Sequence, residues 1–125
     1  MKLRIKGDSV RVRLSITEVK QLCEQGQIED STHFGNNTLS YSVQTKEGID
    51  RLSASFDGNN ISLFLPAPFA KTWESSPLVG YDANMDTGNG RQLYLLLEKD
   101  YKCLDNTMED QSDNFENPLA ANFKK

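Results

Sequence analysis

The sequence has few of the residues that mark disulfide scaffolds, membrane proteins and metal sites. It contains two cysteines, Cys23 and Cys103, and one histidine among 125 residues. A disulfide framework or a zinc site needs more such residues at closer spacing. No apolar run approaches the roughly 20 residues of a membrane-spanning helix, and no signal-like stretch follows Met1. We therefore expect a cytoplasmic protein without a membrane segment.

Short motifs for nucleotides and hydrolysis are also missing. The Gly-x-Gly-x-x-Gly, phosphate-loop, Gly-x-Ser-x-Gly and His-Glu-x-x-His patterns do not occur. The formal net charge of -4 argues against nucleic acid as a partner, because such proteins neutralise phosphates with lysine and arginine. We expect no cofactor and no bound metal.

The charges that are present are distributed unevenly along the chain. Cations crowd the first residues, at Lys2, Arg4, Lys6, Arg11 and Arg13. Acidic residues gather near the other end, at Asp105, Glu109, Asp110, Asp113 and Glu116. The two ends of the chain are therefore complementary in charge.

Alternation of apolar and polar residues predicts a series of β-hairpins along the chain. Runs such as Val10, Val12 and Leu14, with polar residues between them, have the period of a strand that buries one face. Glycine- and asparagine-rich turns separate the runs. These turns are at residues 7–9, 35–37, 57–60 and 88–90.

Two short helices are expected between hairpins. Ser15-Ile16-Thr17-Glu18 is a capping-box pattern, in which the serine and glutamate side chains bind free backbone amides at a helix start. Gly26 supplies a residue suited to ending that helix. Pro66-Ala67-Pro68 predicts the start of a second helix that includes Trp73, because proline is tolerated in the first turn.

The two halves of the chain match at a spacing of about fifty residues. Val10, Val12 and Leu14 fall on Ile61, Leu63 and Leu65. With a small insertion allowed in the turn at residues 88–90, Leu39, Tyr41 and Val43 fall on Leu93, Leu95 and Leu97. The match predicts a duplication, although any β-β-α-β-β chain would imitate a repeat. The expected fold class is α+β, with duplicated halves forming a mainly antiparallel, strongly curved or barrel-like sheet of about eight strands. We expect one domain at 1–103, with halves of about 1–50 and 51–103, and an acidic, irregular tail at 104–125.

Three segments carry a resemblance to an uncharacterised family of short bacterial proteins. They are residues 1–14, 97–104 and 109–118, and the resemblance covers nearly the whole chain. It implies a bacterial cytoplasmic protein in which the tail matters, and it supplies no catalytic residues.

The topology is also loosely similar to the triphosphate tunnel (CYTH-like) fold, an antiparallel barrel whose enzymes cleave triphosphates with a divalent metal. Those enzymes begin with a Glu-x-Glu-x-Lys strand, and the corresponding strand here is Lys2-x-Arg4-x-Lys6. Cations at these positions would repel Mg²⁺, so the resemblance in fold does not extend to this activity.

The cations of the first two strands are the main candidate site. If the strands pair, Lys2, Arg4, Lys6, Arg11 and Arg13 project from one face, where they could bind an anion. The face could instead be simply solvated, or acidic tail residues could cover it through weak surface ion pairs. The predicted tail contacts are Glu109, Asp110 and Asp113.

The function itself is unknown from the sequence, and two hypotheses follow from the basic face. The first is a non-enzymatic binding or interaction module for an anionic small molecule or a protein partner. The alternative is a hydrolase or transferase for a phosphorylated molecule inside the barrel, with Arg4, Arg11 and Arg13 binding substrate and Glu98 or Asp100 as base. Cations that line a cavity would favour the second hypothesis.

Neither Cys103 nor His33 is predicted to be catalytic. A thiol nucleophile needs a nearby base or positive field, and His33 is distant from Cys103 in the sequence. His33 also has no second histidine or cysteine at ligand spacing, so we interpret it as a hydrogen-bonded structural residue. Cys23 is expected in the core, on the apolar stripe of the first helix.

Overall fold

The protein is described over residues 1–101 by a computed structural model. Eight strands and two helices alternate in a β-β-α-β-β order that occurs twice. The strands are β1 (Lys2–Ile5), β2 (Ser9–Leu14), β3 (Gln27–His33), β4 (Thr38–Lys46), β5 (Ser53–Asp57), β6 (Asn60–Pro66), β7 (Gly80–Gly88) and β8 (Arg91–Lys99). The helices are α1 (Ile16–Gln25) and α2 (Ala67–Trp73).

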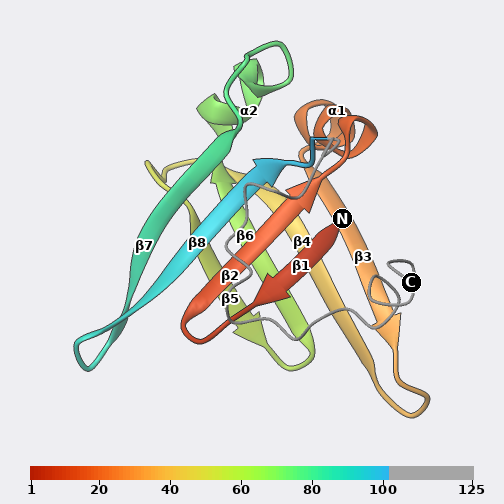
Figure 1. The fold of residues 1–125 in the computed structure, drawn as a ribbon, viewed down its shortest axis with the longest axis vertical. Coiled ribbons are helices and arrows are strands. Elements are labelled where there is room, and N and C mark those ends of the chain that lie inside the picture. Colours follow the sequence, from red (N-terminus) through yellow and green to blue (C-terminus); the bar gives the residue numbers. More distant parts are fainter. Residues whose placement is uncertain (102–125) are drawn as a thin grey trace, which may run out of the picture.

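The strands form two separate four-stranded sheets. The first has the order β1-β2-β8-β7 and the second the order β3-β4-β6-β5. In each sheet the outer pairs are antiparallel hairpins and the central pair, β2 with β8 or β4 with β6, is parallel. Figure 1 shows the sheets one in front of the other, with their strands crossing and both helices at the same end.

The expectation of one mainly antiparallel, barrel-like sheet is therefore wrong, although the α+β class and the succession of elements agree with the structure. Closing a barrel would require ladder hydrogen bonds between edge strands. The edges β5 and β7 approach each other, and the Ala54 amide donates to Met85 Sδ at 3.3 Å, but no ladder joins them. The chain instead crosses from one sheet to the other at each helix.

Each sheet combines one hairpin from each half of the chain. Val12 pairs with Leu97 in the first sheet, and Leu63 pairs with Val43 in the second. These pairs occupy equivalent positions, because Leu63 is the counterpart of Val12 and Leu97 the counterpart of Val43 in the sequence repeat. The halves therefore interleave with matching registers, while their origin by duplication stays a prediction.

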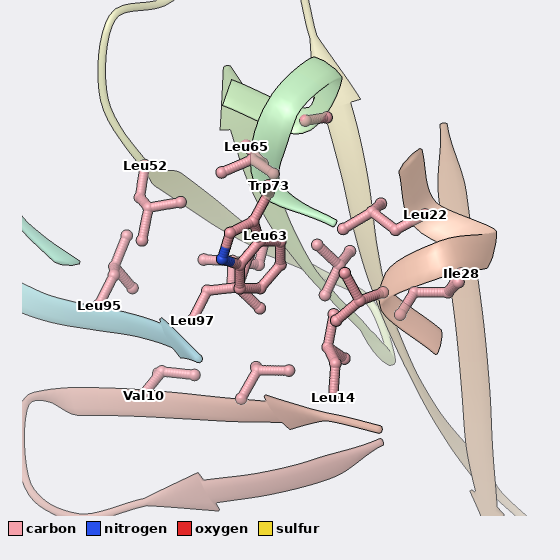
Figure 2. Packing of buried hydrophobic residues seen from close by; sticks show 14 residues of the cluster. Val10, Leu14, Leu22, Ile28, Leu52, Leu63, Leu65, Trp73, Leu95 and Leu97 are labelled. Atoms are coloured by element: carbon pink, nitrogen blue, oxygen red, sulfur yellow. The ribbon is translucent and has the colours of Figure 1, made fainter. Parts of the chain in front are cut away.

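An apolar core fills the space between the two sheets and beneath the helices. Leu14, Leu95 and Leu97 from the first sheet meet Leu63 and Leu65 from the second, all at 1% exposure or less. Trp73 of α2 is fully buried among them (Figure 2). Its indole Nε1 donates to the Leu78 carbonyl at 3.1 Å, so the one polar atom of the ring is satisfied. A substrate-binding barrel interior is therefore absent from residues 1–101.

Local signals explain where α1 begins and ends. Ser15 accepts a hydrogen bond from the Glu18 amide, and the Glu18 side chain accepts one from the Ser15 amide, which completes the predicted capping box. Gly26 ends the helix in the left-handed conformation at φ 81°. Within residues 1–101, no helix has the length and apolar character needed to cross a membrane.

Candidate anion-binding site

The cations of β1 and β2 lie on the outer face of the first sheet. Val10, Val12 and Leu14 point into the core, so the alternate residues Arg11 and Arg13 point outward. The register places Lys2 opposite Arg13 and Arg4 opposite Arg11. Two pairs of like charges therefore face each other directly across the hairpin, an arrangement that opposes folding unless anions compensate it.

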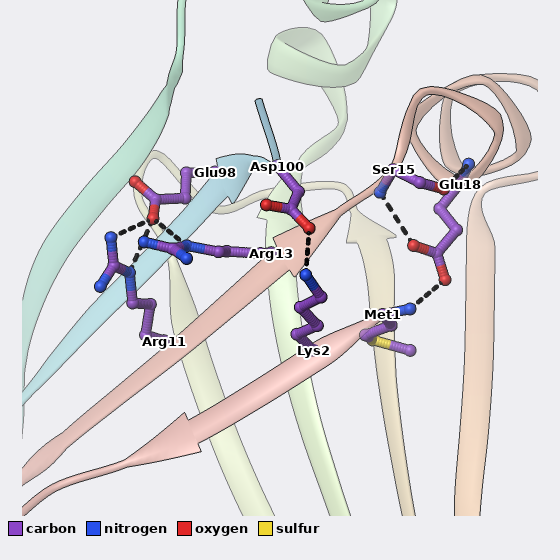
Figure 3. Close-up of polar contacts among 8 residues, drawn as sticks. All are labelled: Met1, Lys2, Arg11, Arg13, Ser15, Glu18, Glu98 and Asp100. Atoms are coloured by element: carbon purple, nitrogen blue, oxygen red, sulfur yellow. Dashed lines mark hydrogen bonds and ion pairs between the residues drawn. The ribbon is translucent and has the colours of Figure 1, made fainter. Parts of the chain in front are cut away.

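Glu98 of β8 compensates the two arginines of β2. Its Oε1 accepts from Arg11 Nε at 2.6 Å and from Arg13 Nε at 2.9 Å (Figure 3). The glutamate side chain is 13% exposed, and the two arginine side chains are about one-third exposed. The parallel pairing brings these residues together, because Arg13 is opposite Glu98 in the register of β2 and β8.

Asp100 compensates Lys2 at the same end of the hairpin. Lys2 Nζ lies 2.8 Å from Asp100 Oδ2 (Figure 3). The hydrogen bond from Lys2 lowers the pKa of the Asp100 carboxyl below its ordinary value. The Asp100 amide also donates to the Leu14 carbonyl at 2.8 Å, which fixes the carboxylate beside the end of β2.

At the other end of the hairpin two cations have no carboxylate partner, while Asp8 in the turn pairs with Arg91 at 3.5 Å. Within residues 1–101, neither the Arg4 nor the Lys6 side chain forms an ion pair. Both are exposed, and with Arg11 they surround a hollow of about 260 Å³. We call it the basic hollow; its lining is Arg4, Lys6, Ser9, Val10, Arg11, Tyr94 and Leu96.

Tyr94 adds an aromatic wall to the basic hollow. Its hydroxyl donates to Asp82 Oδ2 of β7 at 2.9 Å. This hydrogen bond to the carboxylate raises the pKa of Tyr94, because it stabilises the protonated phenol. The hydroxyl is thus occupied by Asp82, while the ring and Leu96 give the hollow an apolar side.

The structure assembles part of the predicted site. All five cations lie along one hairpin, but Arg11 and Arg13 are bound by Glu98 and Lys2 by Asp100, which leaves Arg4 and Lys6 for a ligand. Sequence reasoning missed Ser9, Tyr94 and Leu96. Alternation places all three on an outer face, but only the pairing of β2 with β8 shows that they share one hollow. The predicted tail contacts Glu109, Asp110 and Asp113 lie outside the described residues.

The alternative roles of Glu98 and Asp100 as a base do not fit their surroundings. Both carboxylates are held by cations: Glu98 by Arg11 and Arg13, and Asp100 by Lys2. Asp100 also lines a hollow of about 270 Å³ beside α1, but none of the cations Arg4, Arg11 and Arg13 that were predicted to bind substrate lines that hollow. Cys103 lies outside the described residues, and His33 is an exposed residue whose Nδ1 is 3.1 Å from Thr38 Oγ1. Burial raises the pKa of the Cys23 thiol, which packs partly buried against the core.

No cluster of three or more histidine, cysteine, aspartate or glutamate side chains that could hold a metal occurs within residues 1–101.

The comparisons with known proteins identify a family whose function is unknown. The model of a family of unknown function (DUF7009) matches residues 1–119, and the chain belongs to this family. No curated protein and no solved structure matches the chain. The looser similarity to the triphosphate tunnel fold has no support from either comparison, and the barrel of that fold is absent from the described residues.

Proposed function

We propose that this member of the family is a binding module that takes a small anionic ligand, with a phosphate or carboxylate group, in the basic hollow. One observation carries the proposal. Arg4 stands directly opposite Arg11 across the hairpin, and Arg4 has no carboxylate partner within residues 1–101. A bound anion would compensate the charge of Arg4, as Glu98 compensates Arg11 and Asp100 compensates Lys2.

The shape and lining of the hollow are consistent with a small ligand. Its volume of about 260 Å³ is just below the roughly 300–1,000 Å³ typical of small-molecule sites. The planar fork of arginine donors at Arg4 suits phosphate and carboxylate oxygens, and Lys6 adds a second cation without a carboxylate partner within residues 1–101. The ring of Tyr94 and the side chain of Leu96 would contact an apolar part of the same molecule. The predicted cytoplasmic location and bacterial origin fit such a ligand and remain predictions.

The acidic tail would be a competing occupant of the basic hollow. Contacts of Glu109, Asp110 and Asp113 with the cations, predicted from sequence, would occupy the hollow without an external ligand. Replacing the three residues by Gln, Asn and Asn would then strengthen binding of inorganic phosphate. Unchanged phosphate binding would exclude this competition.

Thermal unfolding tests the proposed function. Inorganic phosphate and pyrophosphate should raise Tm relative to chloride at equal ionic strength, because a ligand at ten times its Kd adds about 1.4 kcal/mol to the free energy of unfolding. Arg4→Gln should abolish the rise. Lys20→Gln is the matched control, since Lys20 is an exposed cation of α1 outside the hollow. No rise in Tm for wild type, or an equal rise in Tm for wild type, Arg4→Gln and Lys20→Gln, would exclude the site.

A further inference from the structure

The second sheet contains a hollow at the position equivalent to the basic hollow. Arg11 and Leu96 are paired in the first sheet, and their counterparts Ser62 and Ser42 are paired in the second. The second hollow has a volume of about 250 Å³ and lies over the parallel pair β4 and β6, as the basic hollow lies over β2 and β8. The interleaved fold therefore produces two similar depressions on opposite outer faces.

The chemistry of the second hollow differs from that of the first. Where the basic hollow has Arg11 and Leu96, the second has two serines, and its lining includes no lysine or arginine. Its single charged residue is Glu29. Hydroxyls and amides, which both donate and accept hydrogen bonds, make up most of the remaining polar groups. An anion would meet the Glu29 carboxylate there without a compensating cation.

Ser42 forms the floor of this second hollow. It is 7% exposed and is the one buried polar residue within residues 1–101. Gln44 Nε2 donates to Ser42 Oγ at 3.1 Å, and Ser42 Oγ donates to Ser62 Oγ at 3.4 Å. When Ser42 donates to Ser62 in this way, the Ser62 hydroxyl hydrogen is available to donate to a ligand.

Glu29 supplies the complementary acceptor. It is opposite Ser42 in the register of β3 and β4, which places the carboxylate in the same row as Ser42 and Ser62. Within residues 1–101, the Glu29 carboxylate forms no hydrogen bond or ion pair. The next row, Ser40 opposite Asn60, adds a hydroxyl and an amide to the rim.

We propose that the second hollow binds the vicinal diol of a neutral sugar. One ligand hydroxyl donates to the Glu29 carboxylate, and its neighbour accepts from the Ser62 hydroxyl. A carboxylate accepting from a ribose hydroxyl is an established form of sugar recognition in proteins. This site is separate from the basic hollow, so it holds or fails independently of anion binding.

The test compares two small ribosides in an NMR titration of the full chain. Methyl β-D-ribofuranoside has a vicinal diol, and methyl 2-deoxy-β-D-ribofuranoside lacks it. The first should shift the amide signals of Ser42, Gln44 and Ser62 with a Kd on the order of 1–10 mM. The deoxy compound should bind at least about tenfold more weakly, because it cannot satisfy the charged acceptor and the donor together.

Variants assign the binding to named groups. Glu29→Gln keeps the size of the side chain and should weaken riboside binding about tenfold or more, whereas Ser62→Ala should weaken it about three- to tenfold. Ser55→Ala is the matched control, because Ser55 is opposite Ser62 in the same row but does not line the hollow. Equal binding of both ribosides, undiminished binding to Glu29→Gln, or shifts confined to the basic hollow would overturn the proposal.

Discussion

At the scale of single residues, the basic face depends on how charges are placed across one hairpin. Alternation in the sequence is enough to predict that the cations of the first two strands share a face. It does not reveal that Glu98, 85 residues after Arg13, binds both arginines of β2. That contact depends on the parallel pairing of strands from different halves, for which the local pattern has no signal.

Arg4 should reduce the stability of the unliganded protein. It is directly opposite Arg11, and like charges in that position are unfavourable by a few tenths to about 1 kcal/mol. Arg4→Gln should therefore raise the free energy of unfolding by about that amount in low salt, with a smaller gain in high salt because salt screens the repulsion. Urea denaturation measures both values.

Lys20→Gln again serves as the control in that urea experiment and should leave stability within about 0.5 kcal/mol. A destabilised Arg4→Gln protein would show that Arg4 makes favourable contacts in the folded chain. Arg4 would then have a structural role and would not be an uncompensated cation.

At the scale of elements, the helices and hairpins follow from the sequence more closely than their partners do. The capping box at Ser15 and the glycine at position 26 define α1 because each satisfies backbone groups locally. Strand pairing is different, since a pattern of alternating residues shows which face is buried but not which strand lies beside it. The prediction of a barrel was wrong because the neighbours of each strand could not be read from this pattern.

The start of α1 should make stability depend on pH. Burial alone would raise the pKa of Glu18, but contacts with the N-terminal ammonium and Ser15 outweigh it and lower the pKa below 4.5. A carboxyl with a lowered pKa in the folded state stabilises it above the pKa of the unfolded chain and loses that effect as pH falls. The free energy of unfolding should therefore decrease below about pH 4.5.

Glu18→Gln isolates this contribution to acid stability. The difference in the free energy of unfolding between wild type and Glu18→Gln should be constant near neutral pH and shrink as pH falls below about 4.5. Glu24→Gln, an exposed change on the same helix, should leave the wild-type acid profile intact. A wild-type profile parallel to that of Glu18→Gln would contradict the assigned contact.

Gly80 is required where β7 meets β8. A Cβ atom at Gly80 would lie 2.2 Å from the Leu97 carbonyl oxygen and 2.7 Å from Glu98 Cα. Gly80→Ala should therefore force the two strands apart and destabilise the protein by about 1–3 kcal/mol or more. Chemical denaturation measures this loss in the free energy of unfolding. Gly58→Ala is the control, because a Cβ atom there meets open space and the substitution costs mainly backbone strain. A neutral Gly80→Ala would show that the strands are less closely apposed.

At the scale of the whole molecule, neither half of the chain forms a sheet alone. Both central pairs, β2 with β8 and β4 with β6, join strands from different halves. The core is likewise shared, since Leu14 and Leu22 from the first half are buried with Trp73 and Leu97 from the second. Burial of apolar surface therefore depends on both halves at once.

Separate halves should fail to fold. Fragments 1–50 and 51–125 should each give the circular dichroism and NMR spectra of an unfolded chain, because each would retain isolated hairpins that are marginal in water. Mixing or co-expressing the two should restore dispersed NMR signals. A folded spectrum from either fragment alone would contradict the interleaved topology.

The most direct test of the account is the affinity of the basic hollow for inorganic pyrophosphate, measured by isothermal titration calorimetry at fixed ionic strength. Wild type and Lys20→Gln should bind with the same Kd, and Arg4→Gln should bind at least about tenfold more weakly, since a hydrogen bond to a charged group contributes about 1.5–3 kcal/mol. Equal affinities of Arg4→Gln and Lys20→Gln, or no binding to wild type, would contradict an anion site at this end of the hairpin.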